Sequence, residues 1–294
     1  MTMQDETFFT FAKKGRCLLP AIIVMALLGC KNSNSNLEER STYFVNFVEG
    51  AQAVNDRTRF LVFHYTAQDE EASMTSLQGE FVSAHYLIPE NPVFQRDKPV
   101  VIQLVDEKKR AWHAGVSHWN GRTNLNDSSI GIEIVNRGYA DDEQGLRHWY
   151  PYNDSQIIAL SKLAEDIIQR YKITPDNVVG HSDIAPLRKQ DPGKLFPWKA
   201  LAQMGIGAWP DEHTINTYLA GRNPHTKGNI VTLQQALLRY GYTEMPQNGM
   251  LDDTTRKIIS AFQMHFRPDD TRGEADAETE AIACALNEKY RPEK

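Results

Sequence analysis

Residues 180–193 read Gly-His-Ser-Asp-Ile-Ala-Pro-Leu-Arg-Lys-Gln-Asp-Pro-Gly, and the rest of the chain is organised around this stretch. Val178 and Val179 precede it with the pattern of a buried strand end, so His181 stands where a strand passes into a loop, a common place for active-site residues. A catalytic zinc needs three nitrogen or carboxylate ligands and one open position. His181 and Asp191 could supply two, so we predict that the loop is half of a metal site.

The composition excludes some classes of function. The chain has 294 residues, of which 41% are hydrophobic and 24% charged, which is typical of a globular protein long enough for two domains. The formal net charge is -6, and no basic stripe interleaved with aromatic residues is found. Nucleic acid is therefore not the expected partner.

The amino terminus has the pattern of an export signal. Basic residues precede an apolar run over residues 18–28, which is short for a membrane span but suits a signal-peptide core. The run ends Leu-Leu-Gly-Cys at residues 27–30, which resembles the bacterial lipobox. We expect a signal peptide over 1–29, lipidation at Cys30 and a polar tether over 30–41; the alternative is a chance cysteine after an ordinary signal.

The residue after the cysteine bears on location. Lys31 is not the aspartate that favours retention in the inner membrane during lipoprotein sorting. We therefore expect a protein anchored by lipid in the outer membrane and facing the periplasm.

A third metal ligand is expected at the end of another strand. Residues 59–66 are almost continuously apolar, like a strand buried on both faces, and His64 stands near the carboxyl end. A lone histidine there is more often a core residue, but the need for a third ligand favours His64. His85, in a predicted strand over 83–88, is the main rival and ranks second because its strand continues past it.

A glutamate in a third strand is a candidate for catalysis. Alternation over residues 126–136 places three isoleucines on one face and Gly131 with Glu133 on the other. A carboxylate inside a strand is costly unless it is paired or has a task, and Gly131 is expected to leave room for substrate beside it. Trp112 and His113, next to small residues, suggest a surface for a sugar or peptide, or else packing around a tight turn.

Helices are expected around these strands. Asp69 and the two glutamates after it suit the first turn of one helix, and Asp154 can cap an amphipathic helix that reaches residue 171 and covers the sheet. After residue 210 only helical patterns follow. We predict an α/β domain over 42–210 and a small all-α domain over 211–294.

Four motifs, in order, carry a resemblance to a known family: His64-Tyr65-Thr66, Trp112-His113-Ala114-Gly115, Asn126 through Glu133, and His181 through Gly193. Together they resemble the zinc-dependent N-acetylmuramoyl-L-alanine amidases of the type 2 family. The resemblance implies a central mixed β-sheet flanked by helices. It also implies hydrolysis of the amide between the lactyl group of N-acetylmuramic acid and L-alanine in peptidoglycan. The alternative is a recognition protein on the same fold that binds peptidoglycan without cleaving it.

The resemblance assigns roles to single residues. The zinc ligands would be His64, His181 and Asp191. The catalytic residues would be Glu133, which passes a proton from water to the leaving amine, and Lys189, which stabilises the oxyanion. We expect substrate contacts from four further residues: Trp112, His113, Asn126 and His85. A phage member of the family has a tyrosine where this chain has Ala84, which puts more weight on Glu133 and Lys189.

The carboxyl-terminal helices resemble a different family. The pattern over residues 231–242, then Asn248-Gly249 and Phe262-Gln263, is similar to the three-helix peptidoglycan-binding domain. The alternative is a helical cap that stabilises the first domain.

Overall fold

The computed structural model describes residues 36–47 and 50–292. The chain forms two compact units, residues 1–54 and 55–294. In the first, strands β1 (Leu37–Glu39) and β2 (Phe44–Asn46) pair antiparallel, and β1 lies inside the predicted tether. The predicted signal peptide, Cys30 and Lys31 lie outside the described residues. Within the described part, no helix has the length and apolar character needed to cross a membrane.

The second unit is built on a five-stranded mixed sheet with the strand order β13-β3-β10-β4-β7. The first four strands run parallel to one another and β7 runs antiparallel to β4. The bounds are β3 (Phe60–Tyr65), β4 (Tyr86–Ile88), β7 (Ile102–Gln103), β10 (Ser129–Ile134) and β13 (Val178–Gly180). The predicted α/β class and the mixed sheet are confirmed.

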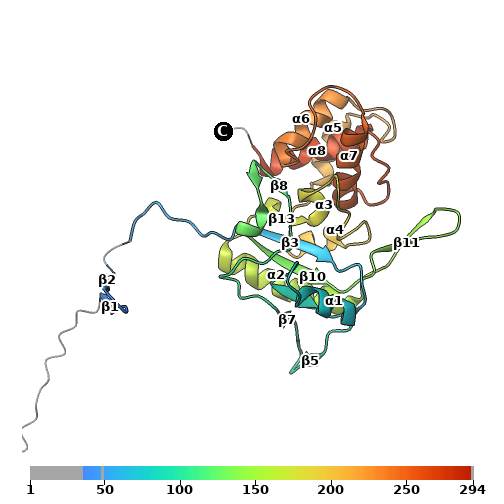
Figure 1. The fold of residues 1–294 in the computed structure, drawn as a ribbon. Coiled ribbons are helices and arrows are strands. Elements are labelled where there is room, and N and C mark those ends of the chain that lie inside the picture. Colours follow the sequence, from blue (N-terminus) through green and yellow to red (C-terminus); the bar gives the residue numbers. More distant parts are fainter. Residues whose placement is uncertain (1–35, 48–49, 293–294) are drawn as a thin grey trace, which may run out of the picture. The chain divides into compact units, whose positions relative to one another are not determined.

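One face of the sheet is covered by helix α2 (Asp154–Tyr171), which lies along the sheet in Figure 1. Its residues Ala159, Leu160, Ala164 and Ile167 are buried in one cluster with Leu61, Phe63 and the three isoleucines of β10. The predicted alternation of β10 is therefore confirmed. The helix begins where expected, but its N-cap is Asn153 rather than Asp154.

The other face of the sheet packs against the carboxyl-terminal helices (Figure 1). Phe60 and Val62 of β3 share a buried cluster with Leu237, Tyr242 and Phe262. These helices are α5 (Glu212–Leu219), α6 (Ile230–Tyr240), α7 (Asp253–Phe266) and α8 (Ala277–Tyr290), which we call the helical unit. Strand β3 is buried on both faces because α2 and the helical unit cover it from opposite sides.

The remaining elements are short and lie around the sheet. Helix α1 (Glu70–Leu77) follows β3, and the Asp69 side chain accepts a hydrogen bond from the amide of Ala72, as an N-cap does. The others are β5 (Phe94–Gln95), β6 (Lys98–Pro99), β8 (His118–Trp119), β9 (Arg122–Thr123), η1 (Leu125–Asp127), β11 (Tyr139–Asp141), β12 (Arg147–Trp149), η2 (Pro175–Asn177), α3 (His181–Ile184) and α4 (Trp198–Gln203).

Candidate active site

The candidate residues meet at the carboxyl ends of parallel strands. His64 is the next-to-last residue of β3 and pairs in register with Glu133 of β10. His181 begins α3 directly after β13, the neighbour of β3 on its other side. Asp191 is held beside it because its carbonyl oxygen accepts a hydrogen bond of 2.8 Å from the amide of Ser182. The parallel order of the sheet thus gathers residues that are more than 100 positions apart.

Three donor atoms form an almost regular triangle. Nδ1 of His64, Nδ1 of His181 and Oδ2 of Asp191 lie 3.0 Å from one another, and all three side chains are buried. Ligands about 2.0–2.1 Å from a tetrahedral zinc ion lie about 3.3 Å apart, so this set fits such an ion. His64, His181 and Asp191 form a group that can hold a metal, and His85 is not part of it.

The hydrogen-bond network leaves both Nδ1 atoms free to ligate. His181 Nε2 donates to the carbonyl oxygen of Ala114 at 3.1 Å, and His64 Nε2 lies 2.9 Å from Nδ1 of His113. A neutral imidazole that donates through Nε2 has a lone pair on Nδ1. Burial, together with the neighbouring ring of His181, lowers the pKa of His64 to about 4, so the His64 ring is neutral at pH 7.

His113 lines the cavity of the site, but both of its ring nitrogens are engaged, Nδ1 with His64 and Nε2 with Ser129. Its Nε2 lies 3.0 Å from the hydroxyl of Ser129, which donates to the carbonyl oxygen of Leu125 at 2.7 Å. The prediction that Gly131 leaves room for substrate is wrong, because a Cβ at Gly131 would lie 2.4 Å from Cγ of His113. Glycine is needed there so that the histidine ring can pack against the strand.

Glu133 is the acidic residue of the site that has a carboxylate oxygen without a hydrogen-bond partner among the described residues. This oxygen is Oε2, which is buried. Burial and the charge of Asp191 raise the pKa of Glu133 well above its usual value, while the charge of Lys189 opposes this shift. An unpartnered carboxylate oxygen is costly, so its place in the site favours a role in proton transfer.

A cavity of about 280 Å³ joins these groups. It is lined by Glu133, His181, Lys189 and Asp191, and Trp112 lines it with 55% of its surface exposed. The predicted catalytic pair therefore faces the same space as two of the three metal ligands, His181 and Asp191, and Trp112 is accessible to a substrate there.

Two of the predicted substrate contacts are turned away from this cavity. Both ring nitrogens of His85 are taken by the backbone, because Nδ1 accepts from the amide of Gly131 at 3.0 Å and Nε2 lies 3.1 Å from the carbonyl oxygen of Lys109. The Asn126 side chain accepts hydrogen bonds from the amides of His113 and Ala114. Both are buried, so the prediction of direct substrate contact is corrected to one of structural support.

Sequence reasoning missed a buried contact between the metal-binding loop and the helical unit. Asp183, two residues after His181, accepts hydrogen bonds from Tyr242 Oη at 2.6 Å, from His265 Nδ1 at 2.7 Å and from the amide of Gly180 at 2.7 Å. The His265 ring stacks on Trp198 with 3.7 Å between centroids. No local pattern could reveal these partners, which are 59 and 82 residues away along the chain.

Replacing Asp183 with alanine is expected to lower the free energy of unfolding by about 3 kcal/mol, because it leaves several buried donors without an acceptor. Asp211→Ala is the matched control: Asp211 pairs with Lys289 at the surface, and we expect a loss below about 1 kcal/mol. Urea unfolding of both variants measures the difference. Equal losses in the two variants would contradict a structural role for Asp183.

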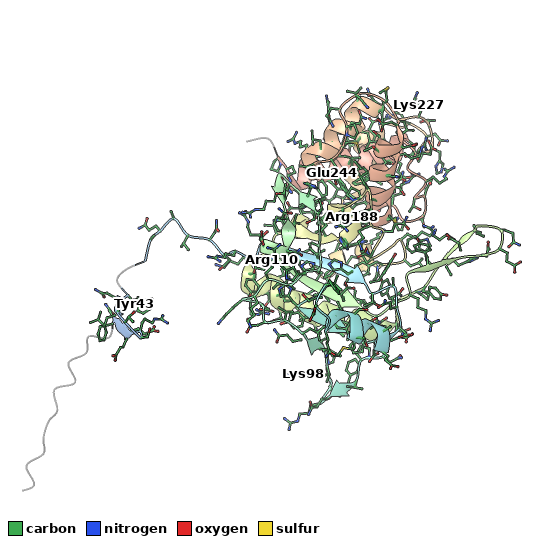
Figure 2. The ribbon with its side chains drawn as sticks, in the orientation of Figure 1. Tyr43, Lys98, Arg110, Arg188, Lys227 and Glu244 are labelled. Carbon is green, nitrogen blue, oxygen red and sulfur yellow. The ribbon has the colours of Figure 1, made fainter. Side chains whose placement is uncertain are left out.

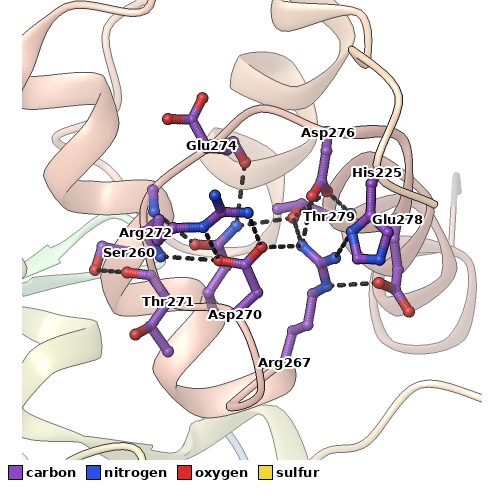
Figure 3. A network of polar contacts seen from close by, with 12 residues as sticks. His225, Ser260, Arg267, Asp270, Thr271, Arg272, Glu274, Asp276, Glu278 and Thr279 are labelled. Atoms are coloured by element: carbon purple, nitrogen blue, oxygen red, sulfur yellow. Dashed lines mark hydrogen bonds and ion pairs between the residues drawn. The ribbon is translucent and has the colours of Figure 1, made fainter.

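A second group of possible metal ligands already surrounds a cation of the protein itself. His225, Asp270 and Asp276 lie close together in the helical unit, with Arg267 between them (Figure 3). Arg267 Nη1 lies 2.6 Å from Asp276 and Nη2 lies 3.3 Å from His225, while Nε lies 2.6 Å from Glu278. The guanidinium group accounts for this cluster without a metal.

Comparisons with known proteins agree with this geometry. A family model described as N-acetylmuramoyl-L-alanine amidase matches residues 54–194, and one described as putative peptidoglycan binding domain matches residues 226–282. The amidase AmiD of Escherichia coli K12 is 51% identical over 90% of this chain and 95% of its own length. The amidase AmpD of Enterobacter cloacae is 42% identical over 41% of this chain and 59% of its own length.

Solved structures of amidases are also similar to this chain. That of E. coli AmiD with anhydro-N-acetylmuramic acid-L-Ala-D-gamma-Glu-L-Lys covers 88% of this chain and all of its own, with 50% identity and a TM-score of 0.84. That of AmpDh3 from Pseudomonas aeruginosa with anhydromuramic pentapeptide covers 86% of this chain and 98% of its own, with 45% identity and a TM-score of 0.73. The chain belongs to the type 2 N-acetylmuramoyl-L-alanine amidase family.

Proposed function

We propose that this protein is a zinc-dependent amidase that hydrolyses the bond between the lactyl group of N-acetylmuramic acid and L-alanine of the peptidoglycan stem peptide. The observation that carries the proposal is the triangle of His64, His181 and Asp191 beside the unpartnered carboxylate of Glu133. Relatives that align over most of the chain carry the name of this activity.

The residues of the site divide the chemistry among them. A zinc ion held by His64, His181 and Asp191 would supply Lewis-acid chemistry, which polarises a carbonyl group and lowers the pKa of water. Glu133 takes the proton from the attacking water and passes it to the nitrogen of the leaving L-alanine. The ammonium group of Lys189 stands at the same cavity and stabilises negative charge on the carbonyl oxygen. Trp112 offers an aromatic face to the substrate.

The function is tested with defined muropeptides. The purified chain, supplied with zinc, should release free stem peptides that mass spectrometry identifies by their new amino-terminal L-alanine. A sugar that keeps its lactyl carboxylate should appear in equal amount. Muropeptides that bind but stay intact would instead favour a recognition protein on this fold.

We further propose that lipid on Cys30 anchors the enzyme in the outer membrane, facing the periplasm. The support is the signal-like run over residues 18–28, which ends in Gly29-Cys30. Cys30→Ser should abolish incorporation of radiolabelled fatty acid and release the protein from sedimented outer membranes. Fatty-acid labelling that persists in this variant would contradict the assignment.

The helical unit is proposed to hold the enzyme on the polymeric wall. The support is the match of residues 226–282 to a putative peptidoglycan-binding family.

A further inference from the structure

A second cavity of about 710 Å³ adjoins the catalytic one. The two share Tyr65, Ala67, Lys189 and Asp191 as lining residues, so one opens beside the other. We call the second cavity the side groove. Its remaining walls come from three sources: the loop that follows His181, the segment after β10, and helix α7 of the helical unit.

The helical unit thus forms part of the approach to the catalytic residues. Lys257, Ser260 and Met264 of α7 line the side groove, together with Arg137 and Tyr139 from the segment after β10. The shared core between β3 and the helical unit holds α7 in this place. Helix α7 can therefore contact a substrate in the side groove without any movement of the helical unit relative to the sheet.

The side groove carries an excess of positive charge. Four cations line it, Arg137, Arg188, Lys189 and Lys257, against a single carboxylate, Asp191. Asp191 is already engaged with two histidines. Over residues 36–47 and 50–292, Arg137 and Lys257 form no ion pair, and both are exposed.

Arg188 is the exception among the four. Its guanidinium group donates hydrogen bonds to the carbonyl oxygens of Ala114 and Val116, which fixes it in the wall. Figure 2 labels it near the junction of the sheet and the helical unit, not far from Glu244. The cations free to meet a ligand from outside are therefore Arg137 and Lys257, with Lys189 at the catalytic end.

The positive charge of the side groove favours the peptide half of the substrate over the sugar half. Free cations in a groove favour carboxylate or phosphate ligands. The lactyl carboxyl group of the sugar is consumed in the amide, so the sugar half is neutral. In the peptide of the AmiD complex, the glutamate is linked through its γ-carboxyl group, so its α-carboxylate is free. The stem peptide ends in a further carboxylate.

We propose that Lys257 of the helical unit and Arg137 bind the free carboxylates of the stem peptide in the side groove. The helical unit then determines peptide specificity as well as packing on the sheet. The sugar lies on the other side of the scissile bond, toward Trp112. This inference rests on the proposed amidase function only for the identity of the ligand.

The first test measures binding without turnover. The probe is the free tripeptide L-Ala-γ-D-Glu-L-Lys, titrated by calorimetry into the full chain and into Lys257→Glu and Arg137→Glu. Each charge reversal should weaken binding by about tenfold, because attraction becomes repulsion. The control is Lys227→Glu, an exposed lysine that Figure 2 places at the end of the helical unit remote from Arg188, and its affinity should be unchanged.

A second peptide, with its glutamate α-carboxylate amidated, identifies the group that is bound. It should bind the wild-type chain more weakly, and at least one of the two reversals should no longer matter. Reversals that leave both affinities unchanged, or a tripeptide that does not bind at all, would overturn the inference. Preferred binding of an anionic polymer such as polyphosphate would overturn it as well. Peptide binding that depends on Lys257 in a chain without amidase activity would instead overturn the proposed function alone.

Discussion

Replacing Asp191 with alanine is expected to reduce bound zinc from about one ion per chain to almost none and to abolish hydrolysis. Asp191 supplies the negative charge among the three donors, and its Oδ2 lies 3.0 Å from Nδ1 of both His64 and His181. Burial acts to raise the pKa of Asp191, but His181 and His64, whose Nδ1 atoms lie 3.0 Å from its Oδ2, outweigh burial and hold the pKa below its usual range. The donor is therefore a carboxylate at neutral pH.

The control is a histidine that sequence reasoning ranked as the rival ligand. His85→Gln should keep about one zinc ion per chain, because both ring nitrogens of His85 already bond to backbone groups. Elemental analysis after dialysis measures the metal, and circular dichroism checks the fold of each variant. A zinc-free His85 variant beside an Asp191 variant with full zinc would reverse the assignment of the site.

The sequence predicts the reactive groups better than their supports. His64 and Glu133 stand in strongly apolar strands, and His181 directly follows one. A polar side chain at such a place is costly unless it has a function, and the parallel sheet brings the three residues together. The alternation of side chains along a strand determines the face of the sheet on which His64 and Glu133 lie. Such signals are local, so a single sequence is enough to read them.

The supports depend on contacts between distant segments. Nothing near His85 or Asn126 in the sequence distinguishes a side chain that contacts substrate from one that bonds to the backbone. The sequence therefore predicts substrate contact for both, whereas both bond to backbone groups. The same holds for Asp183, whose partners Tyr242 and His265 come from the helical unit. Whether a buried polar group is free can be decided only once its neighbours in space are known.

The helical unit packs against the catalytic domain, as expected of a stabilising cap, and it also bonds to the metal-binding loop. Wall binding by the same helices is the other expectation from the sequence, and it stays a proposal. Residues of the helical unit are buried in one cluster with Phe60 and Val62 of the central strand, and its Tyr242 and His265 bond to the loop that carries His181. Stability and the shape of the site are thereby linked, because loosening the helices also frees the loop.

Replacing Glu133 with glutamine is expected to lower kcat by about 10³-fold while zinc content stays unchanged. Glutamine keeps the size of the side chain but cannot act as a base. Glu133 is not one of the three residues that would hold the metal, so its replacement should leave zinc in place. Steady-state kinetics with a defined muropeptide, together with elemental analysis of the same sample, measures both quantities. Loss of zinc in this variant would mean that the glutamate had been wrongly assigned as a base.

The pH dependence gives the same residue a second test. Burial and the charge of Asp191 raise the pKa of Glu133, and only its deprotonated form can accept a proton from water. The activity of the wild-type enzyme should therefore rise with pH as this group loses its proton, and the residual activity of Glu133→Gln should lack that rise. The positive charge of Lys189 opposes the upward shift, so it keeps more of Glu133 in the active form at neutral pH. An identical rise in the glutamine variant would show that another group limits the reaction at low pH, and the proton would then have to leave the water by a different route.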